Sequence, residues 1–320
     1  MALKIKDLRI YYQTLRGDVK AVDGISFQVK DGEIMGLAGE SGCGKSTLSN
    51  ALILLKPPMK YISGEVFLND KKLPIDNYEA MRANRFRGVS IIPQYAMNAL
   101  NPIRKLKQII SDLLEHHGES FVKMRDMIEE RLKLVELDEK VLDLYPIELS
   151  GGMNQRMVMV ISTLLNPSLL LADEITSALD VSSQKAVSKM IIEFRDRKIV
   201  RSVIFVTHDI SILYQVADSI MIMYAGKQVE RAPTETIVKN PLHPYTKLLI
   251  SSLPEVGIKY SQAPLKGIPG RPPELLNPPE GCRFKDRCPV ASEKCDEEPP
   301  LVEIEPGHQV ACWKVGAIDD

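Results

Sequence analysis

The sequence contains no long apolar run and carries almost no net charge. No stretch approaches the 18 or more apolar residues of a membrane-spanning helix, and the first ten residues, MALKIKDLRI, contain no apolar signal core. The formal net charge is −1, so bulk charge gives the chain no attraction to nucleic acid. We therefore expect a cytosolic protein without a nucleic-acid partner, which reaches a membrane only through another protein.

Cysteine is scarce and unevenly placed. Only one of the five cysteines, Cys43, lies outside the last 39 residues. In a cytosolic chain, clustered cysteines favour the ligation of a metal or an iron–sulfur cluster over disulfide bonds. The four clustered residues are Cys282, Cys288, Cys295 and Cys312.

The segment GESGCGKST at residues 39–47 has the G-x-x-x-x-G-K-[ST] spacing of a phosphate-binding loop. Glycines let the backbone curl so that successive N–H groups face one phosphate chain. Lys45 supplies a cation for the outer phosphates, and the Ser46 hydroxyl is a ligand for Mg²⁺. A strand predicted at 33–38 and a helix predicted at 47–55 provide the expected context. The predicted nucleotide-binding residues are Gly39, Glu40, Ser41, Gly42, Cys43, Gly44, Lys45, Ser46 and Thr47.

Three predicted buried strands each end near a polar or charged side chain. Because ligands bind at the carboxyl ends of strands in open α/β sheets, we expect these side chains to lie together. Asp173 is expected to hold Mg²⁺, directly or through water, and Glu174 to orient or deprotonate the attacking water. Taken alone, Gln94 would be interpreted as a surface loop residue and His208 as a structural residue. Both gain a functional interpretation because the chain also contains a phosphate loop. The strands lie at 89–92, 169–171 and within 202–209.

Tyr12 and the segment ELSGGMNQR at 148–156 are further candidates for nucleotide contacts. Tyr12 follows an alternating strand pattern, and its flat ring could stack on adenine or could equally pack in the core. Ser150, Gly151 and Gly152 form a small turn before an apolar helix, and such a turn presents N–H groups to an anion. Without the other motifs this turn would be weak evidence for an anion site, because Ser-Gly-Gly is common in loops.

The order of these motifs resembles the ATP-binding subunit of an ABC transporter. The resemblance covers roughly residues 3–250 and includes the phosphate loop, the glutamine loop, LSGGM, the acid pair, SALD at 177–180 and the loop histidine. Two departures, Met153 for the commoner glutamine and Ile175 for the usual proline, remove no ligand. The resemblance therefore implies an active ATPase.

The end of the chain narrows the resemblance to oligopeptide and dipeptide importers. The segment KNPLHPYTKLLISSLP at 239–254 resembles their His-Pro-Tyr region, and residues 281–313 resemble their cysteine-bearing end. Such a subunit would drive two membrane permease subunits at the cytoplasmic face of the membrane, supplied by an extracytoplasmic solute-binding protein. The helical insertion, with the glutamine loop, would grip a short helix of a permease.

The resemblance also implies a head-to-tail pair of ATPase subunits, identical or merely related. Each ATP would lie between residues 39–47 of one chain and the Ser150 turn of the other, so the pair would close with ATP and reopen after hydrolysis. Gln94 would sense Mg²⁺ and the water, Glu174 would be the base, and His208 would hold the γ-phosphate.

We expect an α/β fold with a phosphate-loop NTPase core, in which helices flank a mixed sheet beside an antiparallel β subdomain. Residues 1–250 are predicted to form the ATPase domain, with an α-helical insertion at about 97–165. Residues 251–320 are predicted to form an irregular extension with a four-cysteine site. Eleven of the 21 prolines lie from Pro254 onward, which leaves little room for helix or strand.

The ligand of the four cysteines is open between several alternatives. Their spacings are x₅, x₆ and x₁₆, and none is the C-x₂₋₄-C pair that is usual at structural zinc sites. Four thiolates at looser spacing suit a [4Fe–4S] cluster, and similar subunits carry one. Zn²⁺ and unligated thiols are the alternatives.

Three functions compete at this stage. The first is an ATPase that energises import of peptides, or of oligosaccharides, metals or another small solute. The second is a soluble ABC ATPase of DNA repair or translation, although the chain lacks the tandem cassettes or long coiled-coil insertion of that class. The third is an iron–sulfur sensor with a vestigial ATPase, against which Glu174 and His208 argue.

Overall fold

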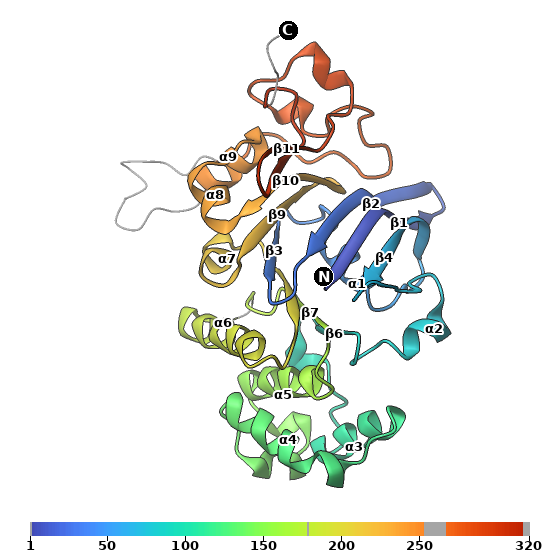
Figure 1. The fold of residues 1–320 in the computed structure, drawn as a ribbon, viewed down its shortest axis with the longest axis vertical. Helices are drawn as coiled ribbons and strands as arrows, with labels where there is room; N and C mark the ends of the chain where they lie inside the picture. Colours follow the sequence, from blue (N-terminus) through green and yellow to red (C-terminus); the bar gives the residue numbers. More distant parts are fainter. Residues whose placement is uncertain (1, 178, 253–266, 316–320) are drawn as a thin grey trace.

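The computed structural model describes residues 2–177, 179–252 and 267–315, and a large mixed sheet forms its centre (Figure 1). Its strands are β3 (Ile34–Ala38), β6 (Val89–Ile92), β7 (Leu169–Asp173), β8 (Ser202–Val206), β9 (Ser219–Tyr224), β10 (Lys227–Pro233), β11 (Val302–Glu305) and β12 (His308–Val310). They lie in the order β11-β12-β10-β9-β3-β8-β7-β6. The strands from β9 to β6 in this order are parallel, and the remaining pairs are antiparallel.

The central strands β3, β7 and β8 are buried along their whole length. Alternate residues enter two different apolar clusters: Ile34 and Ala38 of β3 pack on one face, Met35 and Leu37 on the other. Continuously apolar sequence is typical of parallel strands that are covered on both faces. The strands predicted at 33–38 and 89–92 are confirmed.

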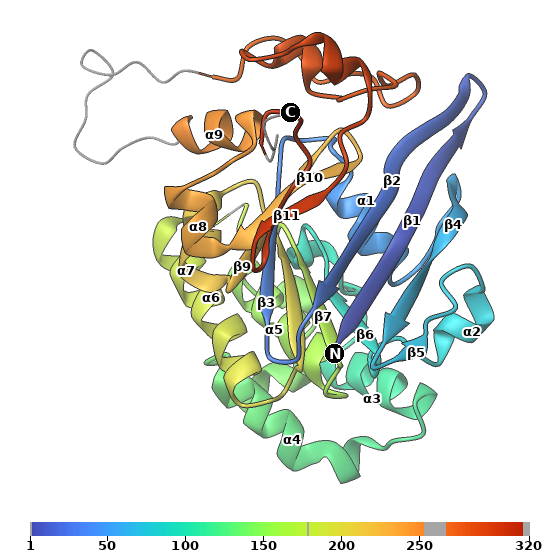
Figure 2. The same cartoon turned by 45° about the horizontal axis from the view of Figure 1, so that its top comes forward.

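A second sheet, antiparallel throughout, packs beside the first and confirms the predicted β subdomain. It runs in the order β2-β1-β4-β5, and Figure 2 shows β1, β2 and β4 side by side. Its apolar side chains share a core with the second face of β3 and with α1. The strands are β1 (Leu3–Thr14), β2 (Gly17–Val29), β4 (Met59–Leu68) and β5 (Lys71–Lys72).

Most of the helices cover the other face of the large sheet, and α3, α4 and α5 lie within the predicted insertion. α3, α4 and α5 gather at the lower end of Figure 1, and the apolar stripe of α3 buries Leu106, Ile110 and Leu114 as predicted. The helix after the phosphate loop begins and ends earlier than expected. The helices are α1 (Lys45–Ala51), α2 (Tyr78–Arg82), α3 (Leu106–His116), α4 (Phe121–Leu134), α5 (Gly151–Thr163), α6 (Val181–Asp196), α7 (Ile210–Val216), α8 (Thr234–Lys239) and α9 (Pro244–Ser251).

The C-terminal lobe, which we define as residues 267–315, contains more regular structure than the proline count suggests. Its hairpin β11–β12 attaches to the large sheet, since Val310 pairs with Glu230 and Gln309 with Arg231. The added strand covers the edge of β10, which would otherwise expose unpaired backbone groups. This hairpin was not predicted from the sequence, because its strands have only four and three residues. Ala178 of the SALD motif and residues 253–266 lie outside the described residues.

Candidate functional site

The phosphate loop connects β3 to α1, and two of its glycines permit an unusually close approach of backbone. Gly39 has φ 147° and Gly44 has φ 107°. A Cβ on Gly39 would lie 2.2 Å from the Met223 carbonyl oxygen, and one on Gly44 would lie 2.0 Å from that of Ala21. Both the positive φ and the absence of space therefore require glycine. These contacts wedge the loop between β2 and β9.

The ammonium of Lys45 lies inside this loop and is buried. Its Nζ donates to the carbonyl oxygens of Gly39 at 2.8 Å and Glu40 at 3.0 Å. The cation therefore stands at the centre of the curled backbone, where a P-loop lysine meets outer phosphates.

Ser46 and Asp173 come together across the sheet edge, as the sequence predicted. The Ser46 hydroxyl donates to Asp173 Oδ1 at 3.2 Å. Burial raises the pKa of Asp173, and the hydrogen bond from Ser46 opposes that rise. A hydroxyl beside a buried carboxylate is an oxygen donor set of the kind that Mg²⁺ prefers. The residues present therefore fit a magnesium ion.

Gln94, Glu174 and His208 also converge, each just beyond the end of a parallel strand. Gln94 Nε2 donates to Glu174 Oε2 at 2.7 Å, and His208 Nδ1 lies 3.8 Å from Glu174 Oε1. Glu174 has φ 48°, and its N–H donates to the Val206 carbonyl at 2.9 Å. A non-glycine residue in the left-handed region is uncommon and is often found at functional sites.

Tyr12 lies next to the loop, whereas the Ser150 turn does not. The Tyr12 hydroxyl is 3.0 Å from Thr47 Oγ1. Ser150 caps α5 by accepting from the Met153 N–H at 3.3 Å, and its neighbours Gly151 and Gly152 are exposed. Within the described part of the chain, no hydrogen bond or ion pair joins this turn to residues 39–47. The turn is therefore available at the surface.

The phosphate loop also contacts the C-terminal part of the chain, which was not predicted from the sequence. Arg287 binds Glu40 of the loop through both carboxylate oxygens, at 2.7 and 2.9 Å. Tyr245, from α9, accepts from the Glu40 N–H at 2.8 Å. The only feature of the sequence that pointed to this region was the His-Pro-Tyr segment, and it did not indicate Glu40 as the residue that Tyr245 contacts.

The four cysteines of the lobe do not form a ready metal site. Burial raises the pKa of Cys282 to about 11, with smaller contributions from the three other thiols of the group. Within the described residues no group of three or more His, Cys, Asp or Glu side chains is arranged to hold a metal ion. The arrangement does not support the predicted [4Fe–4S] cluster or its zinc alternative.

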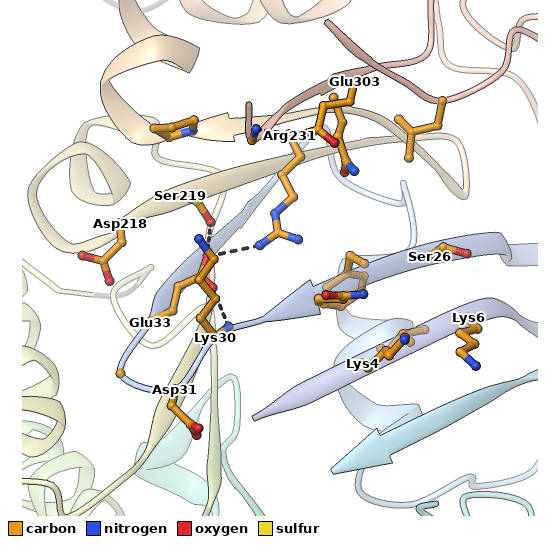
Figure 3. Close-up of a pocket in the computed structure, with 18 residues that line it drawn as sticks. Lys4, Lys6, Ser26, Lys30, Asp31, Glu33, Asp218, Ser219, Arg231 and Glu303 are labelled. Atoms are coloured by element: carbon orange, nitrogen blue, oxygen red, sulfur yellow. Dashed lines mark hydrogen bonds and ion pairs between the residues drawn. The ribbon is translucent and has the colours of Figure 1, made fainter. Parts of the chain in front are cut away.

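A cavity of about 900 Å³ is lined by residues of β1, β2, β9, β10 and the β11–β12 hairpin, and Figure 3 shows its lining side chains. Glu33, which is one of them, accepts from Arg231 at 3.1 Å, from the Ser219 hydroxyl at 2.5 Å and from the Lys30 N–H at 2.7 Å. These bonds tie the β2–β3 turn to β9 and β10. None of the predicted site residues lines this cavity, and we assign its polar groups a structural role.

Comparison with known proteins places the chain in a family. The ABC transporter family profile matches residues 22–177, and the profile described as "Oligopeptide/dipeptide transporter, C-terminal region" matches residues 229–295. A dipeptide transport ATP-binding protein, DppD of Caldanaerobacter subterraneus, is 39% identical over 315 residues, which are 97% of this chain and 96% of that protein. The chain belongs to the ABC transporter ATP-binding subunits of the oligopeptide/dipeptide type.

Further relatives of this ABC subunit agree. The oligopeptide transport ATP-binding protein OppD of Bacillus subtilis is 37% identical over 97% of this chain and 88% of its own length. The cassette MJ0796, solved as a dimer in a post-hydrolysis state bound to ADP and Pi, aligns with a TM-score of 0.64 and 25% identity over 72% of this chain and 98% of its own. The ABC subunit is accordingly an ATPase. Its described helices are all too short or too polar to span a membrane.

We predict that Gly44→Ala destabilises the ABC subunit by about 3 kcal/mol, because strain at positive φ adds to a backbone clash that no side chain can relieve. Gly42→Ala is the matched control: its φ is 79° and nothing lies within 4 Å of the added Cβ, so the cost is about 1 kcal/mol. Urea unfolding of the two variants measures the difference. Equal losses of stability in the two variants would show that the close approach of Gly44 to the backbone of β2 does not exclude a Cβ.

Proposed function

We propose that the chain hydrolyses ATP at residues 39–47 within a head-to-tail pair of cassettes, and thereby energises the uptake of di- or oligopeptides. The observation that carries this proposal is the convergence of Ser46, Asp173 and Glu174 beside the phosphate loop. The Ser46–Asp173 distance of 3.2 Å and the Gln94–Glu174 distance of 2.7 Å support it.

In this proposal, each part of the site has one task. The backbone N–H groups of the loop and Lys45 bind the phosphates, and the start of α1 adds its positive end. Ser46 and Asp173 hold Mg²⁺, which neutralises charge on the β- and γ-phosphates. Tyr12 packs against the adenine, and its hydrogen bond to Thr47 supports a position beside the loop.

Glu174 is the proposed base for the attacking water. Gln94 donates to its carboxylate, which orients Glu174 and leaves its other oxygen facing His208. His208 is largely exposed, so its ring is free to contact the γ-phosphate. The left-handed backbone at Glu174 supports a functional constraint, because such strain is retained where the geometry matters.

A second cassette would complete the site through Ser150, Gly151 and Gly152. This turn is exposed and begins α5, so its N–H groups and the helix end suit an anion. The dimeric state of the related cassette supports such a pair. The two chains of the pair are identical or merely homologous.

The names of the relatives support peptides as the transported class of solute. DppD and OppD are described as dipeptide and oligopeptide transport ATP-binding proteins, and the chain covers almost all of each. We propose that the subunit is peripheral at the cytoplasmic face of the membrane, bound to two permease subunits. A solute-binding protein on the other side of the membrane would deliver the peptide.

The cysteine ligand remains part of the proposal. Cys295 accepts from the Cys282 N–H through its carbonyl at 2.9 Å, which brings the backbone of these two cysteines together. We propose a [4Fe–4S] cluster as the ligand of the four cysteines, with Zn²⁺ as the alternative, because their spacings lack the C-x₂₋₄-C pairs that are usual at structural zinc sites.

For the catalytic proposal, we predict that Glu174→Gln keeps ATP binding but lowers the hydrolysis rate about 10³-fold, since general-base catalysis is lost. With hydrolysis blocked, ATP should hold the cassettes together, and light scattering should show a dimer. Lys45→Ala is the contrasting variant and should lose ATP binding itself. Undiminished hydrolysis in Glu174→Gln would remove Glu174 from the mechanism.

For the transport proposal, we predict that affinity-tagged subunit purified from detergent-solubilised membranes carries two multi-spanning permeases. Reconstituted complex should take up labelled di- or oligopeptide only with ATP, and the Glu174→Gln complex should not. Labelled maltooligosaccharide is the control solute. Uptake of the sugar without the peptide would replace the peptide assignment while leaving the ATPase intact.

For the cysteines, we predict that anaerobically purified protein contains about four iron and four sulfide per chain and is brown. Cys288→Ser should lose the colour and the iron, while Cys43→Ser, outside the lobe, should keep both. A colourless protein with one zinc would favour the alternative, and a metal-free protein would favour unligated thiols.

A further inference from the structure

Glu40, in the phosphate loop, is held from three directions. Its N–H donates to the Tyr245 hydroxyl at 2.8 Å, and its carbonyl accepts from Lys45 Nζ at 3.0 Å. Its carboxylate accepts two bonds from Arg287, at 2.7 and 2.9 Å. Two of these three partners come from beyond residue 240, so the end of the chain contacts the loop directly.

Arg287 is fixed before it reaches Glu40. Its Nε donates to the Pro269 carbonyl at 2.7 Å, and Nη1 donates to the Tyr224 hydroxyl at 3.1 Å. The residue is only 8% exposed. A planar guanidinium with its remaining donors occupied has one orientation, so it presents a rigid fork to the carboxylate.

Tyr245 is fixed by the structure of the His-Pro-Tyr segment. His243 caps α9 by accepting from the Tyr245 N–H at 3.0 Å, and burial lowers the pKa of His243 to about 3, so the ring is a neutral acceptor. The Tyr245 ring lies 4.6 Å from that of Tyr224 and 5.3 Å from that of Phe284, between centroids. These contacts aim the hydroxyl at the loop.

The position of Glu40 affects the part of the loop that meets phosphate. Its N–H is engaged by Tyr245 and does not face a nucleotide. Its carbonyl, however, orients the ammonium of Lys45, and it also accepts from the Cys43 N–H at 3.3 Å. A shift of Glu40 would therefore move both the cation and the curl of the backbone.

We propose that Arg287 and Tyr245 are positioning residues for ATP: they hold Glu40, and through it Lys45 and the loop, in the shape that receives the phosphates. The inference rests on the proposed binding of ATP at residues 39–47. The C-terminal lobe is then part of the ATPase site, and nucleotide affinity depends on how the lobe is docked. The chemistry of this contact is a bidentate ion pair plus one neutral hydrogen bond.

The test measures ATP·Mg²⁺ binding by titration calorimetry and steady-state hydrolysis, with the full chain. Arg287→Ala should raise the Kd and the KM for ATP about tenfold and change kcat by less than about twofold, because binding rather than the chemical step is affected. Arg287→Lys should recover only part of the affinity, since an ammonium cannot make both bonds. Tyr245→Phe, which keeps the ring, should raise the Kd about threefold.

A double-mutant cycle separates this role from simple attachment of the lobe. Glu40→Gln and Arg287→Ala should each weaken ATP binding, and the double variant should be no weaker than Arg287→Ala alone. His308→Ala is the matched control, because His308 binds the buried carboxylate of Glu230 at 2.7 Å and does not touch the loop. It should lower the melting temperature without changing the Kd.

Two outcomes would overturn the inference. One is unchanged ATP affinity in Arg287→Ala and Glu40→Gln while the wild type binds ATP and Lys45→Ala does not. The other is an equal loss of affinity in His308→Ala, which would mean that any loosening of the lobe has the same effect. If the wild type itself bound no ATP, or Lys45→Ala bound it normally, the proposed function would fail instead.

Discussion

The common edge of the parallel strands is the constraint on which the site depends. β7 and β8 pair in register, with Asp173 opposite Val206, so the two strands end level. β3 lies next to β8 and delivers the phosphate loop to the same edge. As a result, Ser46 and Asp173 meet at 3.2 Å although they are 127 positions apart. Strand order, more than the shape of any one loop, places the groups that the proposed chemistry needs.

Buried and half-buried carboxylates of the cassette attach the C-terminal lobe to it. A carboxylate removed from water is costly unless it is paired and hydrogen-bonded, and each of these has a partner from the lobe. Burial alone would raise the pKa of Asp23, but the hydrogen bond from Tyr11 and the nearby cations outweigh it and hold that pKa below its usual range. The lobe therefore supplies a partner for each of these carboxylates, in addition to the partners that Asp23 and Glu230 have within the cassette. The pairs are Asp23 with Arg283, Glu40 with Arg287, and Glu230 with His308.

Short-range patterns in the sequence made part of the fold and of the site predictable. The phosphate loop, the buried strands and the stripes of α3 could be predicted because their signals lie within a few residues, and the convergence of Gln94 with Glu174 followed from parallel strands. The contact of Glu40 with Arg287 could not be predicted, because the two charged residues are 247 positions apart and no periodic pattern in the sequence links them. The β11–β12 hairpin was not predicted either, because its strands of four and three residues are too short to give a recognisable alternating pattern.

The lobe places two arginines and two cysteines on one short segment of backbone, residues 282–288. Arg283 follows Cys282, and Arg287 precedes Cys288. The Cys288 N–H donates to the Lys285 carbonyl at 3.1 Å, in the same turn that orients Arg287. A bidentate pair tolerates little displacement, so any change of the thiols that shifted this turn would also move the guanidinium relative to Glu40. The turn at Lys285–Arg287 therefore joins the cysteine-bearing segment to the residue that binds Glu40 of the phosphate loop.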